Sequence, residues 1–176
     1  MQTGTPPKGA PASGARVPYA LTPTFTDCVP VQLEVFVVED NQEIQENLVG
    51  TLEELTCVKV VGSAATEEGA LQWVAAQNDW DMLIVDLFLK GGSGMRVVQQ
   101  VHRTRVAQKI VVFSNYVNAS VRKRCAQLGV DAVFDKSTEI DALVDYCAHQ
   151  CTLLDLKAAL TEDQHATRRV SNSTGC

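Results

Sequence analysis

The sequence predicts an α/β fold in which five parallel strands form one sheet with helices on both of its faces. Five short apolar runs of strand length alternate along the chain with longer segments in which apolar residues recur at the helical period. Most of these runs are continuous and rich in β-branched residues, which is typical of strands that are covered on both faces. Together these two observations favour a single layered α/β domain.

The five strand candidates follow one another in regular order. Lys59 interrupts the second run, and a charge at that point suits an edge strand because it discourages pairing with other chains. Strands that alternate with helices imply right-handed crossovers, and therefore a parallel sheet. The runs occupy residues 35–38, 58–61, 82–85, 110–113 and 130–134.

Three of the segments between the runs carry amphipathic stripes. Asn41 is placed to cap the first helix, and Thr138 with Asp141 fits a capping box at the start of the last helix. Two further helices are expected at 67–77 and 94–103, the second of them after a loop with three glycines. The stripes comprise Ile44, Leu48, Leu52 and Leu55; Val117, Val121, Cys125 and Leu128; and Ile140, Leu143, Val144, Cys147, Cys151 and Leu154.

Composition divides the chain into a domain at residues 31–160 and two tails. Residues 1–30 are rich in proline, glycine, serine and threonine, and residues 161–176 are mostly small and polar. Such segments cannot bury enough apolar surface to offset the entropy lost on ordering. We therefore expect both tails, 1–30 and 161–176, to be disordered.

Charge and hydropathy argue against two classes of partner. The net charge is −6 and no long Lys/Arg cluster occurs, which disfavours a nucleic-acid surface. No apolar run approaches the roughly 18 to 20 residues that span a bilayer, and the first residues do not form a secretory signal. These features favour a cytoplasmic protein that contacts no membrane.

The six cysteines are scattered and contain no C-x-x-C pair. A cytoplasmic domain of this size needs no covalent links, so we expect free thiols. Cys147 and Cys151 are four positions apart, on one face of the last helix, and we interpret them as core or boundary residues rather than metal ligands.

Polar side chains follow four of the five predicted strands. The carboxyl ends of parallel strands meet at one edge of the sheet, where α/β proteins bind their ligands. We therefore expect these groups to converge although they lie up to 97 positions apart. They are Glu39-Asp40 after the first strand, Asp86 after the third, Ser114-Asn115 after the fourth and Asp135-Lys136 after the fifth.

The convergence of these groups suits one kind of chemistry. Carboxylates that are brought together repel one another, and Mg²⁺ relieves the conflict because it prefers oxygen ligands. Lys136 offers a positive charge for a phosphoryl group, and Ser114 offers a hydroxyl donor. A nucleophilic aspartate, a cation, a lysine and a hydroxyl are the parts needed to form an acyl phosphate. Each group alone is explained by turn or helix-cap chemistry, and only their joint placement favours a site.

Residues 33–150 resemble the receiver domains of bacterial two-component response regulators. The spacings of 28 residues from Asp86 to Ser114 and of 22 from Ser114 to Lys136 are similar to those of the family. The resemblance is carried by residues 35–41 (VFVVEDN), 82–87 (MLIVDL) with 92–94 (GSG), 111–114 (VVFS) and 134–137 (FDKS).

The resemblance implies a flavodoxin-like sheet of order 2-1-3-4-5 with helices on both faces. It also implies that Asp86 accepts a phosphoryl group from a sensor histidine kinase or a histidine phosphotransfer protein, in the presence of Mg²⁺. In that assignment Ser114 and Lys136 hold the phosphoryl oxygens. The implied metal ligands are Asp86, Asp40, Glu39 through a water molecule, and the backbone carbonyl of Phe88.

Three positions depart from the family pattern. Ser137 replaces the proline that usually follows the lysine, which leaves open whether the Lys136–Ser137 peptide is cis. Val133 stands where an aromatic switch residue is usual. Asn115 replaces the small residue that usually follows Ser114, and with Tyr116 after it we expect narrower access to the site. We therefore expect residues 114–118, with Tyr116 as the largest mover, to carry any conformational switch.

If the 176 residues are the whole protein, neither tail holds a DNA-binding module. We then expect a single-domain regulator that acts by protein contact and is not an enzyme beyond assisting its own phosphorylation and dephosphorylation. A degenerate receiver that is never phosphorylated, or a phosphate sink, is the alternative. A phosphohydrolase with an aspartyl-phosphate intermediate fits less well, because its nucleophile lies in an Asp-x-Asp pattern on the first strand. A nucleotide-binding domain lacks its G-x-G-x-x-G or P-loop.

Overall fold

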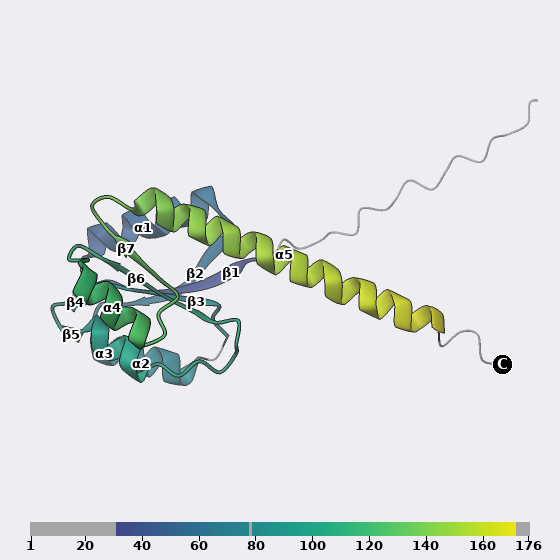
Figure 1. Ribbon diagram of the computed structural model, residues 1–176, viewed down its shortest axis with the longest axis horizontal. Coiled ribbons are helices and arrows are strands. Elements are labelled where there is room, and N and C mark those ends of the chain that lie inside the picture. Colours follow the sequence, from purple (N-terminus) through teal and green to yellow (C-terminus); the bar gives the residue numbers. More distant parts are fainter. Residues whose placement is uncertain (1–30, 78, 172–176) are drawn as a thin grey trace, which may run out of the picture.

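A computed structural model describes residues 31–77 and 79–171, with side chains described as far as residue 161. Its centre is a parallel sheet in which the strands lie in the order β2-β1-β3-β6-β7 (Figure 1). Counted along the chain among these five strands, the order is 2-1-3-4-5, which confirms the predicted flavodoxin-like sheet. The strands are β1 (Leu33–Val38), β2 (Val58–Ala64), β3 (Met82–Val85), β6 (Lys109–Ser114) and β7 (Ala132–Asp135).

Five helices cover the sheet in two layers, with α1 and α5 on one face and α2, α3 and α4 on the other (Figure 1). The predicted second and third helices are present, and each ends one to three residues earlier than expected. The helices are α1 (Gln42–Leu55), α2 (Glu67–Ala76), α3 (Gly94–Gln100), α4 (Ala119–Gln127) and α5 (Ile140–Ser171).

The continuous apolar strands are explained by the two cores that they separate. On β1, Val35 and Val37 belong to the core under α1 and α5, whereas Phe36 and Val38 belong to the core under α2, α3 and α4. Successive side chains of a strand point to opposite faces, so a strand with a core on each side has to be apolar at every position. The exposed Lys59 lies on β2, an edge strand of the sheet, as expected.

The start of α1 follows the prediction and that of α5 does not. Asn41 caps α1, because its Oδ1 accepts from the backbone nitrogens of Glu43 and Ile44 at 3.0 and 3.3 Å. At the start of α5 the carboxylate that reaches back to the chain is that of Glu139, which accepts from the Asp135 amide at 2.7 Å. The described hydrogen bonds include none from a capping box of Thr138 and Asp141.

A small antiparallel hairpin follows β3 and was not predicted, since its strands β4 (Phe88–Leu89) and β5 (Gly92–Ser93) have two residues each. The hairpin returns the chain so closely that α3 begins against the end of β3. A Cβ atom on Gly94 would lie 1.8 Å from the backbone oxygen of Asp86. Only glycine allows this approach, so Gly94 fixes α3 beside the residue that ends β3.

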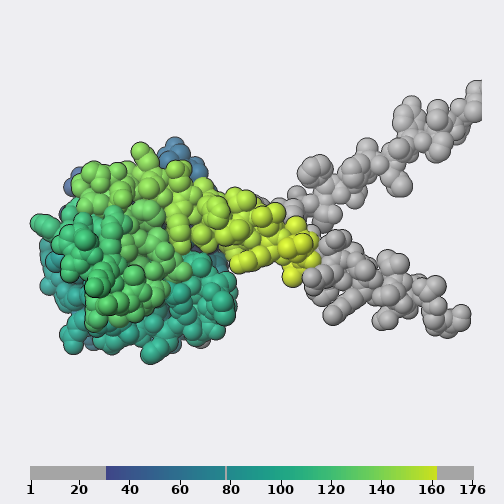
Figure 2. All heavy atoms as spheres, in the orientation of Figure 1, coloured from purple at the N-terminus to yellow at the C-terminus, as the bar shows by residue number. Residues whose placement is uncertain are grey.

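The helix α5 corrects the prediction for the C-terminal tail. It continues to Ser171, so residues 161–171 are helical where we expected disorder. This segment contains neither proline nor glycine, and a helix that is already nucleated gains one hydrogen bond for each residue it adds. Figures 1 and 2 show α5 extending beyond the body of the domain. The expected tail at 1–30 and residues 172–176 lie outside the described residues.

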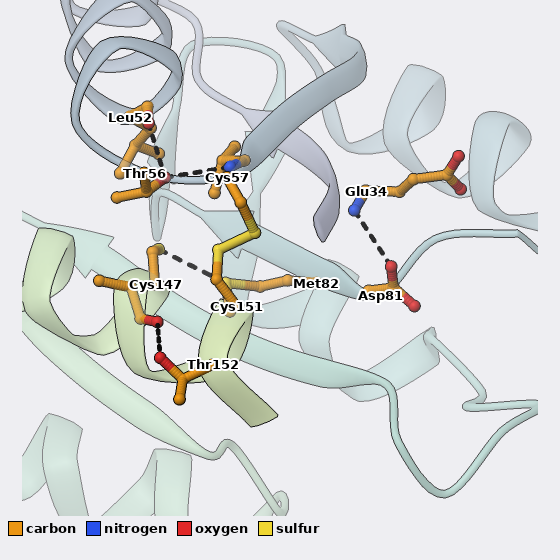
Figure 3. The surroundings of a disulfide bond; sticks show 11 residues. Glu34, Leu52, Thr56, Cys57, Asp81, Met82, Cys147, Cys151 and Thr152 are labelled. Atoms are coloured by element: carbon orange, nitrogen blue, oxygen red, sulfur yellow. Dashed lines mark hydrogen bonds between the residues drawn. A yellow bond between two sulfur atoms is a disulfide. The ribbon is translucent and has the colours of Figure 1, made fainter. Parts of the chain in front are cut away.

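Two cysteines that were expected to be free thiols form a disulfide. Cys57, in the turn between α1 and β2, is bonded to Cys151 of α5, with 5.8 Å between their Cα atoms (Figure 3). The two positions are 94 residues apart, but α1 and α5 lie on the same face of the sheet and bring them together. Cys151 is still a core residue, as predicted, and so is the free thiol of Cys147 one turn earlier.

None of the described helices is long and apolar enough to cross a membrane.

Candidate functional site

The strand ends deliver the predicted polar groups to one place. A cavity of about 280 Å³ opens at the carboxyl edge of the sheet, at the ends of β1, β3 and β6 and just after β7. All six residues expected to form the site line it, although they are drawn from segments that span 97 positions. The lining residues are Glu39, Asp40, Asn41, Ile44, Asp86, Phe88, Lys90, Ser114, Asn115, Tyr116 and Lys136.

Three carboxylates form the acidic part of the cavity. One oxygen from each of Glu39, Asp40 and Asp86 lies within 4.8 Å of the other two. Glu39 and Asp86 are buried, and Asp40 is half-buried at the rim. Closely spaced carboxylate oxygens are the ligands that a hard divalent cation such as Mg²⁺ prefers. The donor set therefore fits the predicted metal.

Lys136 places a buried positive charge among these carboxylates. Its side chain is only 5% exposed, and its Nζ donates to Asp86 Oδ2 at 2.7 Å and also to Glu39. Its backbone nitrogen donates to the Ser114 carbonyl at 3.1 Å, which attaches the turn after β7 to the end of β6. Buried charges are tolerated only when they are paired. The ammonium group therefore compensates two carboxylates that are held close together.

The Ser114 hydroxyl is buried, and no described group is placed to hydrogen-bond to it. A buried polar atom without a partner is costly, so such atoms are rare in folded proteins. Because Ser114 lines the cavity, a ligand with acceptor oxygens in the cavity would give its hydroxyl a partner. A phosphoryl group carries such oxygens.

Two exposed aromatic rings stand at the mouth of the cavity. Phe88 and Tyr116 are in edge-to-face contact, with ring centroids 5.1 Å apart. The Phe88 amide donates to Asp86 Oδ1 at 3.2 Å, so one oxygen of Asp86 is bonded to this amide and the other to Lys136. Tyr116 lines the cavity, and whether it narrows access stays a prediction. Whether the Phe88 carbonyl is a metal ligand stays a prediction.

Sequence reasoning missed one charged residue at the rim. Lys90 donates to Asp40 Oδ2 from its backbone nitrogen at 3.1 Å, and its ammonium lies 3.4 Å from the same oxygen. A lysine in a glycine-rich loop gives no periodic signal, and the hairpin that turns it toward Asp40 was not predicted. Its side chain is 82% exposed, so it can leave Asp40 at little cost.

The positions that depart from the expected pattern are also placed. The described chain contains no cis peptide bond, so the Lys136–Ser137 peptide is trans. Ser137 instead bonds to the Asp135 carboxylate through its backbone nitrogen at 2.8 Å and through its hydroxyl. Val133 is half-buried on β7, and Phe134 beside it packs edge-to-face on Tyr146 of α5.

Comparison with known proteins identifies the family. Residues 35–148 match the response regulator receiver domain, and the chain belongs to this family. Response regulator UvrY of Escherichia coli O6:H1 is 24% identical over 104 residues, which are 59% of this chain and 47% of UvrY. The chain thus spans about half the length of the curated relatives that it matches.

Solved structures agree with the fold. The receiver domain of the putative response regulator NarL from Mycobacterium tuberculosis superposes with a TM-score of 0.58 at 25% identity. The match covers 68% of this chain and 98% of the solved receiver-domain chain. A response regulator from Burkholderia pseudomallei, solved with a phosphorylated aspartic acid, calcium ion and citrate, gives a TM-score of 0.57 at 18% identity. The match covers 80% of this chain and 85% of that regulator's chain. A CheY-like receiver from Methanospirillum hungatei JF-1 gives a TM-score of 0.61 at 16% identity, and the match covers 72% of this chain and 99% of that receiver's chain.

Proposed function

We propose that this receiver domain accepts a phosphoryl group on Asp86 from a phosphohistidine, as one step of a two-component phosphorelay. The arrangement around Asp86 carries the proposal. The Asp86 carboxylate is bonded to a buried lysine, lies beside two further carboxylates, and shares its cavity with an unpartnered serine hydroxyl. Together these groups supply a nucleophile, positive charge, metal ligands and a hydrogen-bond donor in one place.

The transfer needs no further reactant from this chain. A carboxylate oxygen of Asp86 attacks the phosphorus, a P–O bond forms, and the P–N bond to the histidine breaks with its electron pair returning to the imidazole. Lys136, already within hydrogen-bond distance of Asp86 Oδ2, neutralises the charge on the incoming oxygens. Ser114 donates its hydroxyl hydrogen to another of these oxygens. Later attack of water on the acyl phosphate releases inorganic phosphate and restores the carboxylate.

We propose Mg²⁺ as the cation of this site. Asp40 and Asp86 would hold it directly, Glu39 through a water molecule, and the carbonyl of Phe88 would complete the protein ligands. When bound, the metal supplies positive charge that offsets the repulsion between the carboxylates and the phosphoryl oxygens. The oxygen cluster within 4.8 Å supports this assignment. The phosphorylated aspartic acid and calcium ion of the B. pseudomallei regulator are a parallel in a relative of the same fold.

The partners follow from this chemistry. The phosphoryl donor is a sensor histidine kinase or a histidine phosphotransfer protein, and the output is contact with another protein. The domain acts as a phosphoacceptor that assists its own phosphorylation and dephosphorylation, not as an enzyme with a separate substrate. A degenerate receiver or a phosphate sink remains the alternative, and the phosphotransfer assay separates the degenerate receiver from the proposed function.

A phosphotransfer assay tests the acceptor. The purified protein is incubated with a radiolabelled phosphohistidine donor and Mg²⁺, and the label on the protein is followed over time. We expect wild type to take up label that hydroxylamine removes, as it does from an acyl phosphate, and Asp86→Asn to take up none. Asp155→Asn, which changes an exposed carboxylate on α5, is the matched control and should behave as wild type. Label that persists on Asp86→Asn would place the acceptor elsewhere, and an unlabelled wild type would favour a degenerate receiver.

A thermal melt with and without Mg²⁺ tests the metal site. A ligand at ten times its dissociation constant stabilises the folded state by about 1.4 kcal/mol, so Mg²⁺ should raise the melting temperature of wild type. Asp40→Asn should lose this shift. Lys90→Ala removes the charge that competes for Asp40 and keeps the carboxylate, so it should retain the shift. Equal shifts in wild type and Asp40→Asn would contradict the site.

A further inference from the structure

Arg122 joins α4 to the segment that carries Lys136. Its guanidinium donates from Nη1 to the Val133 carbonyl of β7 at 2.6 Å, and from Nη2 to Glu139 Oε2 at 2.8 Å. Glu139 immediately precedes α5. One side chain of α4 is therefore bonded both to β7 and to the residue at which α5 starts. The planar guanidinium can make two such bonds at once, which an ammonium group cannot do with the same geometry.

The same carboxylate oxygen holds the residue before Lys136. Glu139 Oε2 accepts the backbone amide of Asp135 at 2.7 Å as well as the bond from Arg122. These two bonds, that from the Asp135 amide first, hold the pKa of the Glu139 carboxyl below its ordinary value of 4.5. Glu139 therefore stays ionised at neutral pH and keeps both donors. The turn at residues 135–139 is thus fixed from the side of α4.

The turn is also fixed from the side of the phosphoacceptor. Lys136 bonds to Asp86 and Glu39 through its side chain and to the Ser114 carbonyl through its backbone nitrogen. Any change in what Lys136 binds therefore acts on the turn at residues 135–139. Glu139, at the far end of this turn, is bonded to Arg122, so Lys136 and Arg122 both constrain the same few residues.

The helix at the far end of this connection is weakly anchored. Cys125 is its only fully buried side chain, and Val121 and Leu128, near its two ends, are only partly buried against the core. Segments with few buried apolar contacts open at lower free energy than the rest of a domain. The bond from Arg122 to the Val133 carbonyl is therefore a direct polar contact between α4 and β7 on a helix that few buried side chains hold in place.

We infer that Arg122 and Glu139 form a link through which the phosphorylation state of Asp86 controls the position of α4. This inference rests on the proposed function of Asp86. A phosphoryl group brings about 1.5 to 2 negative charges and draws the Lys136 ammonium toward its oxygens. The turn at 135–139 moves with Lys136, the Asp135 amide shifts relative to the Glu139 carboxylate, and the bonds of Arg122 change with it. Arg122 and Glu139 are positioning residues and do not touch the transferred group.

Hydrogen exchange measured by mass spectrometry, with and without beryllofluoride and Mg²⁺, tests the link. Beryllofluoride serves as the phosphoryl mimic, and exchange at residues 86–88 reports whether it binds. In wild type we expect protection to change at 86–88, at 135–139 and in α4. In Arg122→Ala, at beryllofluoride concentrations that saturate the site, we expect faster exchange in α4 without the mimic, an unchanged response at 86–88, and a loss of at least half of the α4 response. Arg122→Lys should restore only part of that response.

Two further variants separate coupling from a purely structural role. Arg124→Ala removes a neighbouring exposed arginine of α4, for which the described residues include no side-chain bond, and should keep the wild-type response. Glu139→Gln keeps an acceptor for the Asp135 amide but loses the ion pair with Arg122, and should weaken the α4 response. Because coupling is reciprocal, Arg122→Ala should also change the affinity for beryllofluoride, by about 5-fold if the coupling is at the low end of the usual range.

The outcomes distinguish this inference from the function on which it rests. A full α4 response in Arg122→Ala, or no α4 response in wild type while 86–88 responds, overturns the link and leaves the phosphoacceptor intact. No response at 86–88 in wild type overturns the phosphoacceptor and, with it, the link.

Discussion

Removal of the Cys57–Cys151 disulfide should cost this domain a large part of its stability. The bond closes a loop of 94 residues in the unfolded chain and so restricts the unfolded ensemble far more than a short loop would. The entropy of closing a loop of this length corresponds to about 4.7 kcal/mol at 25 °C. Native strain and residual structure in the unfolded chain usually reduce this value, so we expect a loss of roughly 2 to 5 kcal/mol. Small domains have only about 5 to 15 kcal/mol in total.

Equilibrium unfolding in urea measures this loss. We would compare wild type with the double variant Cys57→Ser/Cys151→Ala, in which the half-buried position receives a serine and the buried position an apolar residue. With a slope of about 1.5 to 2 kcal/mol per molar urea, the midpoint should fall by roughly 1 to 3 M. Dithiothreitol should lower the urea midpoint of wild type to that of the double variant, and it should leave the midpoint of the double variant unchanged.

If wild type without reductant and the double variant have the same midpoint, or if dithiothreitol changes both equally, the disulfide does not restrict the unfolded chain. The slope gives a second criterion, because a cross-linked unfolded chain is more compact and exposes less surface. The slope should therefore be smaller for oxidised wild type than for the reduced protein.

Three further predictions concern single side chains. Gly94→Ala should destabilise the fold by about 3 kcal/mol or more, because its Cβ would meet the Asp86 backbone oxygen. Gly50→Ala, in the open middle of α1, should stabilise the fold by about 0.5 to 1 kcal/mol. A urea midpoint equal to that of wild type in either variant would contradict the prediction for that variant. Burial raises the pKa of the Cys147 thiol to about 12, so iodoacetamide at pH 8 should leave it unmodified in the folded protein, as mass spectrometry would detect, and label it after unfolding. Because the pKa of Glu139 is lowered, its contribution to stability is present above pH 4.5 and is lost as the pH falls below that value. An NMR titration of the Glu139 carboxyl carbon should give a midpoint below 4.5, and Arg122→Ala should raise that midpoint.

The sheet and the site were predictable because each depends on a pattern that a local stretch of sequence carries. A strand segment with a core on each side has to be apolar at every position, and β3 and residues 35–38 of β1 both show this directly. Polar residues that interrupt such runs at the strand ends, as Asp86 does after β3, stand out for the same reason. The topology of a parallel sheet then brings these ends together without further information.

The features that were missed depend on contacts that no local pattern records. Cys57 and Cys151 are paired only because the turn after α1 and the middle of α5 pack on the same face, and the inference of free thiols rested on the compartment instead. The boundary at residue 160 was drawn where the composition becomes small and polar, but a helix continues through polar residues when none of them breaks it. Arg122 lay in the densest basic stretch of the chain and gave no sign of its bonds to β7 and Glu139.

Because α5 is long, a small rotation at its base becomes a large displacement at its tip, as at the end of a lever. From Cys151 to Ser171 the helix rises by about 30 Å, at roughly 1.5 Å for each residue, and most of that length lies beyond the body of the domain (Figure 1). A rotation of about 10° at the base would therefore carry the tip through roughly 5 Å, the pitch of one helical turn. Leu154 still packs against the core, and the Cys57–Cys151 bond lies about one turn before it, so the disulfide ties down the base of the projecting part of α5. A displacement too small to matter at the sheet would thus become one that a partner bound near the tip could distinguish.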